Sequence, residues 1–366
     1  MSGAQGSGAE KSGAEEGPVL TSVAGRAAHL VLNRPRALNA LTHEMVGLID
    51  AALTAWEEDD TIETVVLTGA GERGLCAGGD IRAIYEAARD GDGQEAADFW
   101  RDEYLLNARL PHYPKPYVAV MDGIVMGGGI GVSAHGSVRI VTERTKAAMP
   151  ETGIGFVPDV GGTWLLSRAP GHLGTRQALT GTVAGPGDAL RLGLADHYVP
   201  SSALPELLAA LATLPAKEAV ERYAAEAPPA ALDTDRPWID ACYAADTVEE
   251  IIARLRARPE DAAHADAATL EGRSPRSLKV TLEALRRVRA LGSLEQALDQ
   301  EYRVSLTCLA TPDLVEGVRA QVVDKDRDPH WNPASLAEVD AADVARFFTP
   351  LGERELGLAP TPEVTR

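Results

Sequence analysis

The segment Lys115–Gly136, "KPYVAVMDGIVMGGGIGVSAHG", decides the fold. Its first part, "KPYVAVMDG", has the apolar and β-branched composition of a buried strand, and "IVMGGGIGVSAHG" is a glycine-rich loop that runs into a helix. The same order occurs just upstream, where "TVVLTG" (64–69) predicts a buried strand, "AGERGLCAGGD" (70–80) a glycine-rich loop and "IRAIYEAARD" (81–90) a helix. Downstream, "VRIVTE" (138–143) predicts another strand. Strands that alternate with helices predict an α/β fold with a mainly parallel sheet.

The ends of the chain differ from this centre. Val19–Asn33 predicts two strands around Ala24–Gly25, and a helix is expected from Leu41 with Thr42 as its cap. After about residue 205 glycine becomes rare, and alanine, leucine, glutamate and arginine follow helical spacing. The predicted organisation is a disordered tail over 1–17, an α/β core over 18–205, a helical C-terminal region over 206–350 and a tail over 351–366.

Composition narrows the function. The 366 residues carry a formal net charge of −19 with a pI near 4.9, whereas a nucleic-acid-binding chain would carry a basic surface. The sequence contains no run of about 18 apolar residues, so it predicts no membrane span. The N-terminal tail lacks the apolar segment of a signal peptide and the arginines of a mitochondrial leader. Three scattered cysteines without CxxC spacing predict reduced thiols, no metal site and a cytoplasmic location.

Two glycine loops each precede a predicted helix. They are Ala77–Asp80 and Gly127–Gly129. Glycine allows a backbone to approach a ligand closely, and the first N–H groups of a helix lack partners. Two such N–H groups that converge on one oxygen would form an oxyanion hole, although either loop alone could be a tight turn that packs a helix.

Two further patterns in the second loop are weak. Gly129–Ala134 fits the GxGxxA dinucleotide fingerprint, but no acid closes a second strand at the proper place. Ser133 and His135 imitate part of a nucleophile elbow, but they are two residues apart and would lie on different faces of a helix. We interpret both as packing or capping residues.

Several motifs in their order and spacing resemble the crotonase (enoyl-CoA hydratase/isomerase) superfamily over about residues 19 to 200. They are "RPRALNAL", "GLCAGGDI", "KPYVAVMDGIVMGGGIG", "MPETGIGFVPDVGG" and "LTGTVAGPGDALRLGLADHYVP". The resemblance implies a ββα superhelix that binds acyl-CoA thioesters without a further cofactor, and it leaves a homo-oligomer open. Gly79 and Gly128 match the positions whose N–H groups hold the thioester oxygen. The positions matching those that line CoA are Arg36, Ala37, Leu38, Ala77, Gly78, Asp80 and Ile81.

The acids distinguish between the reactions of this superfamily. Hydratases of the family use two glutamates, of which the second aligns with Glu151 and the first would fall at Gly131. Because glycine has no proton to give, hydration by the usual pair is disfavoured. Other segments, among them "FWRDEYLLN" and "DQEYRVSLTCLATPDLVEGVRAQVVDKDRDPHWNP", resemble the branch that hydrolyses 3-hydroxyisobutyryl-CoA in valine breakdown. That branch's functional residues match Glu103, Gly128, Glu151 and Asp159.

We therefore expect a short-chain acyl-CoA hydrolase in which Glu151 acts as base or nucleophile and Asp159 assists. An enoyl-CoA hydratase or isomerase is the alternative, and a non-catalytic acyl-CoA-binding or RNA-binding member of the fold is a third reading. Structural roles also remain open for the acids. Glu151 could cap a turn, Asp159 could cap the helix that follows it, and Glu103 could be a solvated residue paired with Arg101 or a neighbour.

Overall fold

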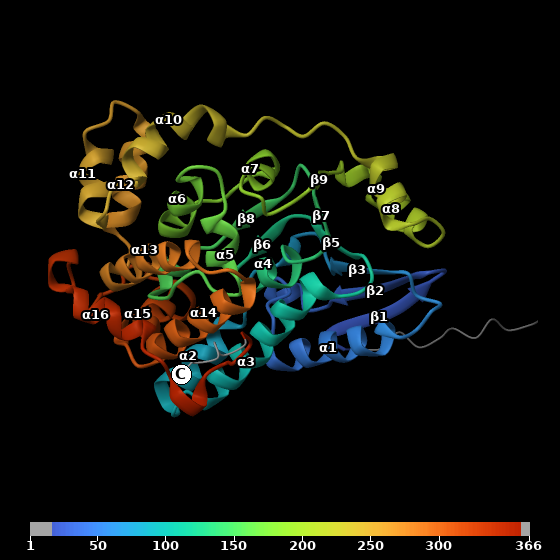
Figure 1. The fold of residues 1–366 in the computed structure, drawn as a ribbon, viewed down its shortest axis with the longest axis horizontal. Coiled ribbons are helices and arrows are strands. Elements are labelled where there is room, and N and C mark those ends of the chain that lie inside the picture. Colours follow the sequence, from blue (N-terminus) through green and yellow to red (C-terminus); the bar gives the residue numbers. More distant parts are fainter. Residues whose placement is uncertain (1–16, 360–366) are drawn as a thin grey trace, which may run out of the picture.

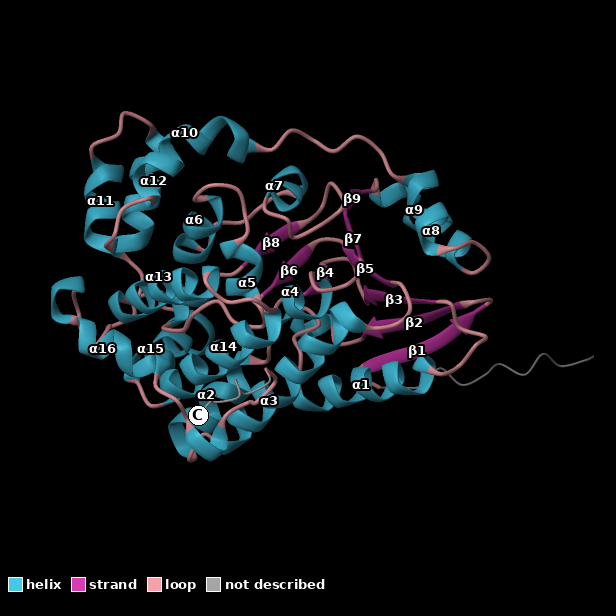
Figure 2. Cartoon of the chain, viewed as in Figure 1, coloured by secondary structure: helices cyan, strands magenta, loops and turns pink. Residues whose placement is uncertain are grey.

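The computed structural model describes residues 17–359, so the predicted N-terminal tail lies outside the described residues except for Gly17. The chain forms two sheets surrounded by helices (Figures 1 and 2). The larger sheet has six strands in the order β1-β2-β3-β5-β7-β9. The strands are β1 (Val19–Ala24), β2 (Ala27–Leu32), β3 (Thr64–Gly69), β5 (Tyr117–Met121), β7 (Val138–Val141) and β9 (His197–Tyr198). β1 and β2 form an antiparallel hairpin, and all later pairs are parallel.

A second, three-stranded parallel sheet has the order β4-β6-β8. Its strands are β4 (Gly74–Cys76), β6 (Ile124–Met126) and β8 (Lys146–Ala148). The chain visits the two sheets in turn, because β3 is followed by β4, β5 by β6 and β7 by β8, with helices between these pairs. This repeating path confirms the α/β fold class that the sequence predicts and the ββα superhelix that the family resemblance implies.

The helices of the first half of the chain pack around the two sheets and connect their strands. They are α1 (His43–Glu57), α2 (Ile81–Asp90), α3 (Gln94–Arg109), α4 (Gly128–Ser133), α5 (Gly162–Ser167), α6 (Leu173–Thr180) and α7 (Pro186–Arg191). The Thr42 side chain accepts a hydrogen bond from the N–H of Met45, which confirms it as the cap of α1.

The second half of the described chain is helical, as predicted. Its helices are α8 (Leu204–Leu211), α9 (Ala216–Tyr223), α10 (Ala231–Tyr243), α11 (Val248–Arg256), α12 (Asp261–Glu271), α13 (Pro275–Arg289), α14 (Leu294–Leu309), α15 (Pro312–Val318) and α16 (Ala341–Ala345). An extended segment after α9 crosses the molecule to α10, so α8 and α9 lie apart from the helices that follow (Figure 1). Within residues 17–359 no helix combines the length and apolar character needed to cross a membrane.

Alternation along the strands of the larger sheet creates two apolar faces. Leu30, Val65 and Ala119 face the main core, which also contains α1 and the helices α10 to α15. Val66 and Val118 belong to the smaller core on the opposite face, where α8 and α9 pack. The segment expected as a C-terminal tail packs where it is described: the N–H of Leu358 donates to Asp299 of α14, and Leu356 joins the main core.

Candidate active site

The carboxyl ends of the three short parallel strands bring the predicted site residues together. β4 leads into the Ala77–Gly79 loop, β6 into Gly127–Gly128, and β8 into a single turn of 3₁₀-helix, η3 (Glu151–Ile154). Since neighbouring parallel strands end at the same edge, both glycine loops and Glu151 meet there, with the β6 loop in the middle. A Cβ built on Gly127 would lie 3.0 Å from Oε1 of Glu151 and 3.5 Å from Cα of Gly78.

The two glycine loops place the backbone N–H groups of Gly79 and Gly128 close together. Leu41 pairs with Gly79 as in a parallel bridge, because its N–H donates to Gly78 O (2.9 Å) and its carbonyl accepts from Asp80 N (2.7 Å). The N–H of Gly79 itself therefore points away from Leu41. Gly128 is the first residue of α4, so its N–H has no acceptor within that helix. A Cβ built on Gly128 would lie 3.2 Å from the Gly79 nitrogen.

Three carboxyl groups lie buried around these loops: Glu103, Glu151 and Asp159 are 2%, 6% and 5% exposed. Burial raises the pKa of Glu151 well above its usual range, the nearby charge of Asp159 raises it further, and the Arg273 guanidinium acts in the opposite direction. Oε2 of Glu151 has no hydrogen-bond partner among the described residues. A carboxyl group held this way is a strong base or nucleophile once it ionises.

Asp159 follows η3 and is bonded through its side chain to a distant helix. The Tyr104 hydroxyl of α3 donates to Oδ2 of Asp159 at 2.7 Å. Burial raises the pKa of Asp159 to about 7, and the bond from Tyr104 acts in the opposite direction. The side chain makes no capping bond to α5, whose first turn is preceded by Gly161. The Asp159 side chain is therefore not a cap of α5, which was the alternative that the sequence left open.

Glu103 points from α3 into the same site. Its Oε1 atom lies 2.5 Å from a Cβ built on Gly128 and has no hydrogen-bond partner among the described residues. Burial raises the pKa of Glu103 well above its usual range, and the charge of Asp159 adds to this. Arg101 binds the carbonyls of Arg354, Glu355 and Leu356 instead of Glu103, so the solvated ion pair that the sequence left open does not form.

These groups surround a cavity of about 100 Å³ with a mixed lining. The two glycine loops and the three acids supply the polar side. The apolar side consists of Ile81, Ile84, Phe99, Trp100, Met126, Pro150 and Phe156. Trp100 and Phe156 stack with ring centroids 5.1 Å apart. The volume and the apolar wall suit a short acyl chain beside the three carboxyl groups.

The residues expected to line CoA divide into two groups. Ala77, Gly78 and Ile81 line the cavity. Arg36 and Ala37 are exposed and Leu38 is half-buried in the preceding loop, which is joined to the site because Ala77 N donates to Leu38 O at 3.0 Å. Asp80 does not line this cavity, and its carboxylate forms an ion pair with Arg34 at 2.9 Å.

Sequence reasoning missed several residues that support the acids. Tyr104 binds Asp159 directly, Ser305 of α14 binds the Tyr104 hydroxyl, and Glu301 of α14 binds the N–H of Gly161. Arg273 lies close enough to influence Glu151. "FWRDEYLLN" and "DQEYRVSLT" contain Tyr104, Glu301 and Ser305, but neither stretch shows which of its polar side chains point inward.

The two weak motifs have structural roles. Ser133 donates to the carbonyl of Gly129 at 2.6 Å within α4. His135 Nε2 lies 2.8 Å from Val160 O, and burial lowers the pKa of this imidazole to about 4. Both residues therefore act in packing, as predicted. Within residues 17–359 no cluster of His, Cys, Asp and Glu has the arrangement of a metal site.

Gly131 has no room for a longer side chain. A Cβ built there would lie 2.7 Å from Cβ of Val160 and 3.0 Å from Nδ2 of Asn107. Real Cβ atoms essentially never come within 3.0 Å of such neighbours, so a glutamate at this position would displace Val160, the residue that follows Asp159. The structure thus fills the space in which the first acid of a hydratase pair would begin.

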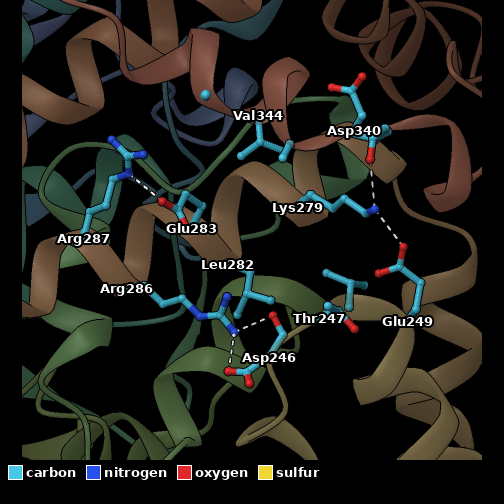
Figure 3. Close-up of a pocket in the computed structure, with 14 residues that line it drawn as sticks. Asp246, Thr247, Glu249, Lys279, Leu282, Glu283, Arg286, Arg287, Asp340 and Val344 are labelled. Atoms are coloured by element: carbon cyan, nitrogen blue, oxygen red, sulfur yellow. Dashed lines mark hydrogen bonds and ion pairs between the residues drawn. The ribbon is translucent and has the colours of Figure 1, made fainter.

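A larger cavity of about 330 Å³ lies elsewhere, between the start of α11, α13 and α16 (Figure 3). Its charged side chains are largely paired: Lys279 with Glu249 at 2.7 Å, Arg287 with Glu283 at 2.7 Å, and Arg286 with Asp246 at 3.6 Å. It contains neither a glycine loop nor any of the three buried acids. The smaller cavity is therefore the candidate active site.

The chain is similar to known proteins over most of its length. Residues 27–348 match the family described as enoyl-CoA hydratase/isomerase. The chain is 42% identical over 355 residues to a mitochondrial 3-hydroxyisobutyryl-CoA hydrolase of Xenopus tropicalis, covering 94% of this chain and 92% of that protein. For the Homo sapiens protein of the same name the identity is 41% over 352 residues, covering 92% and 90%.

Two solved structures are also similar over nearly the whole chain. A carnitinyl-CoA dehydratase from Mycobacterium thermoresistibile has a TM-score of 0.90 and 55% identity, covering 93% of this chain and 98% of that one. An enoyl-CoA hydratase from Rhodobacter sphaeroides has a TM-score of 0.87 and 42% identity, covering 93% and 99%.

The relatives' names correct one prediction. The curated hydrolases are named as mitochondrial, which contradicts the cytoplasmic location expected from the sequence, and that prediction is wrong. The prediction relied on sparse cysteines, and Cys76, Cys242 and Cys308 are indeed free and buried. Buried free thiols show that the fold needs no disulfide, but they do not specify a compartment.

Residue pattern, ββα path, paired glycine loops and near-complete matches agree: the chain belongs to the enoyl-CoA hydratase/isomerase, or crotonase, family.

Proposed function

We propose that this chain hydrolyses short 3-hydroxyacyl-CoA thioesters, with 3-hydroxyisobutyryl-CoA as the expected substrate and valine degradation as the process that supplies it. The observation that carries the proposal is the pairing of a buried Glu151 carboxyl with the two glycine loops, at a site where Gly131 excludes a second acid from α4. Hydrolases named for this substrate are 42% and 41% identical to the chain over most of its length.

The glycine loops would polarise the thioester. The carbonyl oxygen accepts hydrogen bonds from the N–H groups of Gly79 and Gly128. These donors stabilise the tetrahedral oxyanion more than the ground-state carbonyl. Because the loops are fixed to the ends of β4 and β6, the donors need little reorganisation when charge develops. Removal of one such donor typically reduces kcat by about 10²- to 10³-fold.

Glu151 supplies the reacting carboxylate. In one route it attacks the thioester carbon, the C–S bond breaks to release CoA thiolate, and water then hydrolyses the resulting anhydride. In the other route it removes a proton from the water that attacks the same carbon. Both routes consume one water and yield the hydroxy acid and CoA. Asp159 orients that water or binds the 3-hydroxyl group, and Glu103 is placed to bind the same hydroxyl end.

Hydration or dehydration of the acyl chain is the second candidate function. It is favoured by the names of two similar solved structures, a carnitinyl-CoA dehydratase and an enoyl-CoA hydratase. Those reactions move a proton and a hydroxyl group on the acyl chain and leave the thioester intact. The filled space at Gly131 opposes the usual pair of glutamates for this chemistry.

One experiment separates the two reactions. Purified protein is incubated with 3-hydroxyisobutyryl-CoA and a thiol-reactive dye, and in parallel with crotonyl-CoA while the enoyl absorbance is followed. We expect dye reaction with the first substrate and no loss of enoyl absorbance with the second. Loss of enoyl absorbance without thiol release would replace the hydrolase with a hydratase.

A further inference from the structure

The backbone that carries Asp159 has an unusual conformation. Val160 has a φ of +52°, a left-handed value that is strained for a β-branched residue. Such a residue persists only where surrounding contacts determine its conformation. The Val160 carbonyl faces His135, and the next residue, Gly161, also has positive φ. The position of the Asp159 carboxyl therefore depends on what holds this turn.

Glu301 of α14 holds the turn through its backbone. One carboxylate oxygen accepts the N–H of Gly161 at 2.6 Å, and the other accepts the N–H of Thr163 at 2.9 Å as well as the Thr163 hydroxyl. The side chain is 1% exposed. An acid from a helix 138 residues away in sequence thus takes the capping role at the start of α5.

Ser305 lies one turn further along α14 and acts on the side chain of Asp159. Its Oγ is 2.8 Å from the Tyr104 hydroxyl, which has a single proton. Since Tyr104 donates that proton to Asp159 at 2.7 Å, Ser305 is the donor to the Tyr104 oxygen. The bonds run from Ser305 to Tyr104 to Asp159, and this direction favours the ionised form of the Asp159 carboxyl.

We propose that α14 positions Asp159 for catalysis: through Ser305 it orients the Tyr104 hydroxyl that binds the carboxylate, and through Glu301 it fixes the turn from Asp159 to Gly161. This inference rests on the proposed function, because it assigns positioning residues to that same site. It also gives the helical C-terminal region a direct part in the reaction, since Glu301 and Ser305 are on one face of α14 at i and i+4.

Tyr104→Phe tests the hydrogen bonds that run from Ser305 through Tyr104 to the Asp159 side chain. The variant keeps the ring and removes the bond to an ionised carboxylate, so we expect kcat to fall about 10- to 100-fold while KM changes little. The acid limb of the pH–kcat profile should move to higher pH, because the lost bond favoured ionised Asp159. Glu103, Glu151 and Glu301 also face Asp159 and have pKa values raised by burial, but the substitution leaves all three in place. Tyr302→Phe is the matched control: Tyr302 packs edge-on against Tyr104, and its hydroxyl binds Ala97 O at 3.4 Å.

If Tyr104→Phe kept the kcat and acid limb of wild type, the positioning role would be overturned while the hydrolase function stood. A fall in activity that Tyr302→Phe reproduced, with no movement of the acid limb, would equally overturn it, since such a fall reports packing alone.

Glu301→Gln and Thr163→Val test the hydrogen bonds by which Glu301 holds the turn after Asp159. Glutamine keeps one acceptor oxygen of the two, and valine removes one of the three donors while keeping the shape of threonine. We expect both to reduce kcat, Glu301→Gln more strongly, with KM nearly unchanged. Should Glu301→Gln fail to fold, Thr163→Val alone tests the backbone contacts of Glu301. A wild-type kcat in folded Thr163→Val protein would contradict the role proposed for these contacts.

An independent readout separates this inference from the proposed function. If wild type releases no CoA from any acyl-CoA, the hydrolase proposal fails, and infrared absorption then decides the positioning role. The protonated-carboxyl band that is absent from Asp159→Asn protein should titrate at higher pH in Tyr104→Phe than in wild type or Tyr302→Phe. Equal titration in all three would contradict it.

Discussion

Glu151 and Asp159 are equally buried, yet their surroundings differ. Asp159 accepts a hydrogen bond from Tyr104, whereas Oε2 of Glu151 has no partner among the described residues. The charge of Asp159 adds to the effect of burial and raises the pKa of Glu151 further. The unpartnered oxygen is the one free to meet a thioester carbon or a water. The proposed division of tasks between the two acids therefore rests on local environment more than on residue type.

The burial of Asp159 has a measurable effect on stability. The folded-state pKa is raised from 3.8 to about 7, so the contribution of this group favours folding at low pH and is lost as the pH rises through that interval. Asparagine stays neutral at every pH. We expect the Tm of Asp159→Asn, relative to wild type, to be about 2–4 °C higher at pH 8.5 than at pH 5 in scanning calorimetry. A difference independent of pH would show that Asp159 is not buried as an acid.

For single residues, the sequence predicted the acids of the site but not the residues that bind and orient them. Glu103, Glu151 and Asp159 could be proposed because they lie in motifs that resemble a family, and the structure brings all three to one cavity. Tyr104 and Glu301 could not, since their partners lie 55 and about 140 residues away and only tertiary packing joins them. Arg36 and Ala37 are exposed on a loop outside the cavity, so their expected contact with CoA stays a prediction.

The three-stranded sheet is the element that assembles the site. Its strands have three residues each, too short to be distinguished in sequence from the glycine loops that follow. The sequence therefore predicts a loop throughout 70–80, where the structure has strand β4 at Gly74–Cys76. The longer strands of the large sheet carry a continuous apolar signal and were predictable. The separation into two sheets was implied only by resemblance, because pairing partners are not encoded in any single strand.

The glycine loops allow a direct test at the level of the element. In Gly128→Ala the new methyl group would lie 2.5 Å from Oε1 of Glu103 and fill the space beside Gly79, so we expect kcat/KM for CoA release to fall about 10²-fold or more. Gly47→Ala is the matched control, because Gly47 lies in α1 with nothing within 4 Å of a built Cβ.

The control should keep full activity and gain about 0.5–1 kcal/mol of stability, as alanine does in an exposed helix interior. The oxyanion assignment would be abandoned if folded Gly128→Ala protein hydrolysed substrate at the wild-type rate.

For the whole molecule, the C-terminal helices α10 to α15 are part of the main core. Apolar side chains form one cluster from Val19 in β1 to Leu356, and α14 lies within it against α3 and α5. Composition alone marked residue 205 as a boundary, because glycine becomes rare there. The structure shows that α8 and α9 cover the far face of the large sheet, while α13 to α15 pack around the site (Figure 1).

This continuity predicts one cooperative unfolding transition. Trp100 reports on the cavity, whereas Trp238 lies in α10 of the C-terminal region, so fluorescence and far-UV circular dichroism should give the same midpoint. Leu298→Ala, a truncation at a fully buried position of α14, should lower the free energy of unfolding by about 2–5 kcal/mol and move both midpoints together. Two separated transitions would indicate that the C-terminal helices form an independent unit.

We propose that Glu151, buried beside the two glycine loops, cleaves an acyl-CoA thioester. The most direct test compares the rate of CoA release from 3-hydroxyisobutyryl-CoA by wild type, by Glu151→Gln and by Glu353→Gln, whose glutamate is exposed. We predict that Glu151→Gln loses at least about 10²-fold in kcat, since glutamine can neither attack nor accept the proton, and that Glu353→Gln matches wild type. Undiminished CoA release by folded Glu151→Gln protein would contradict the account.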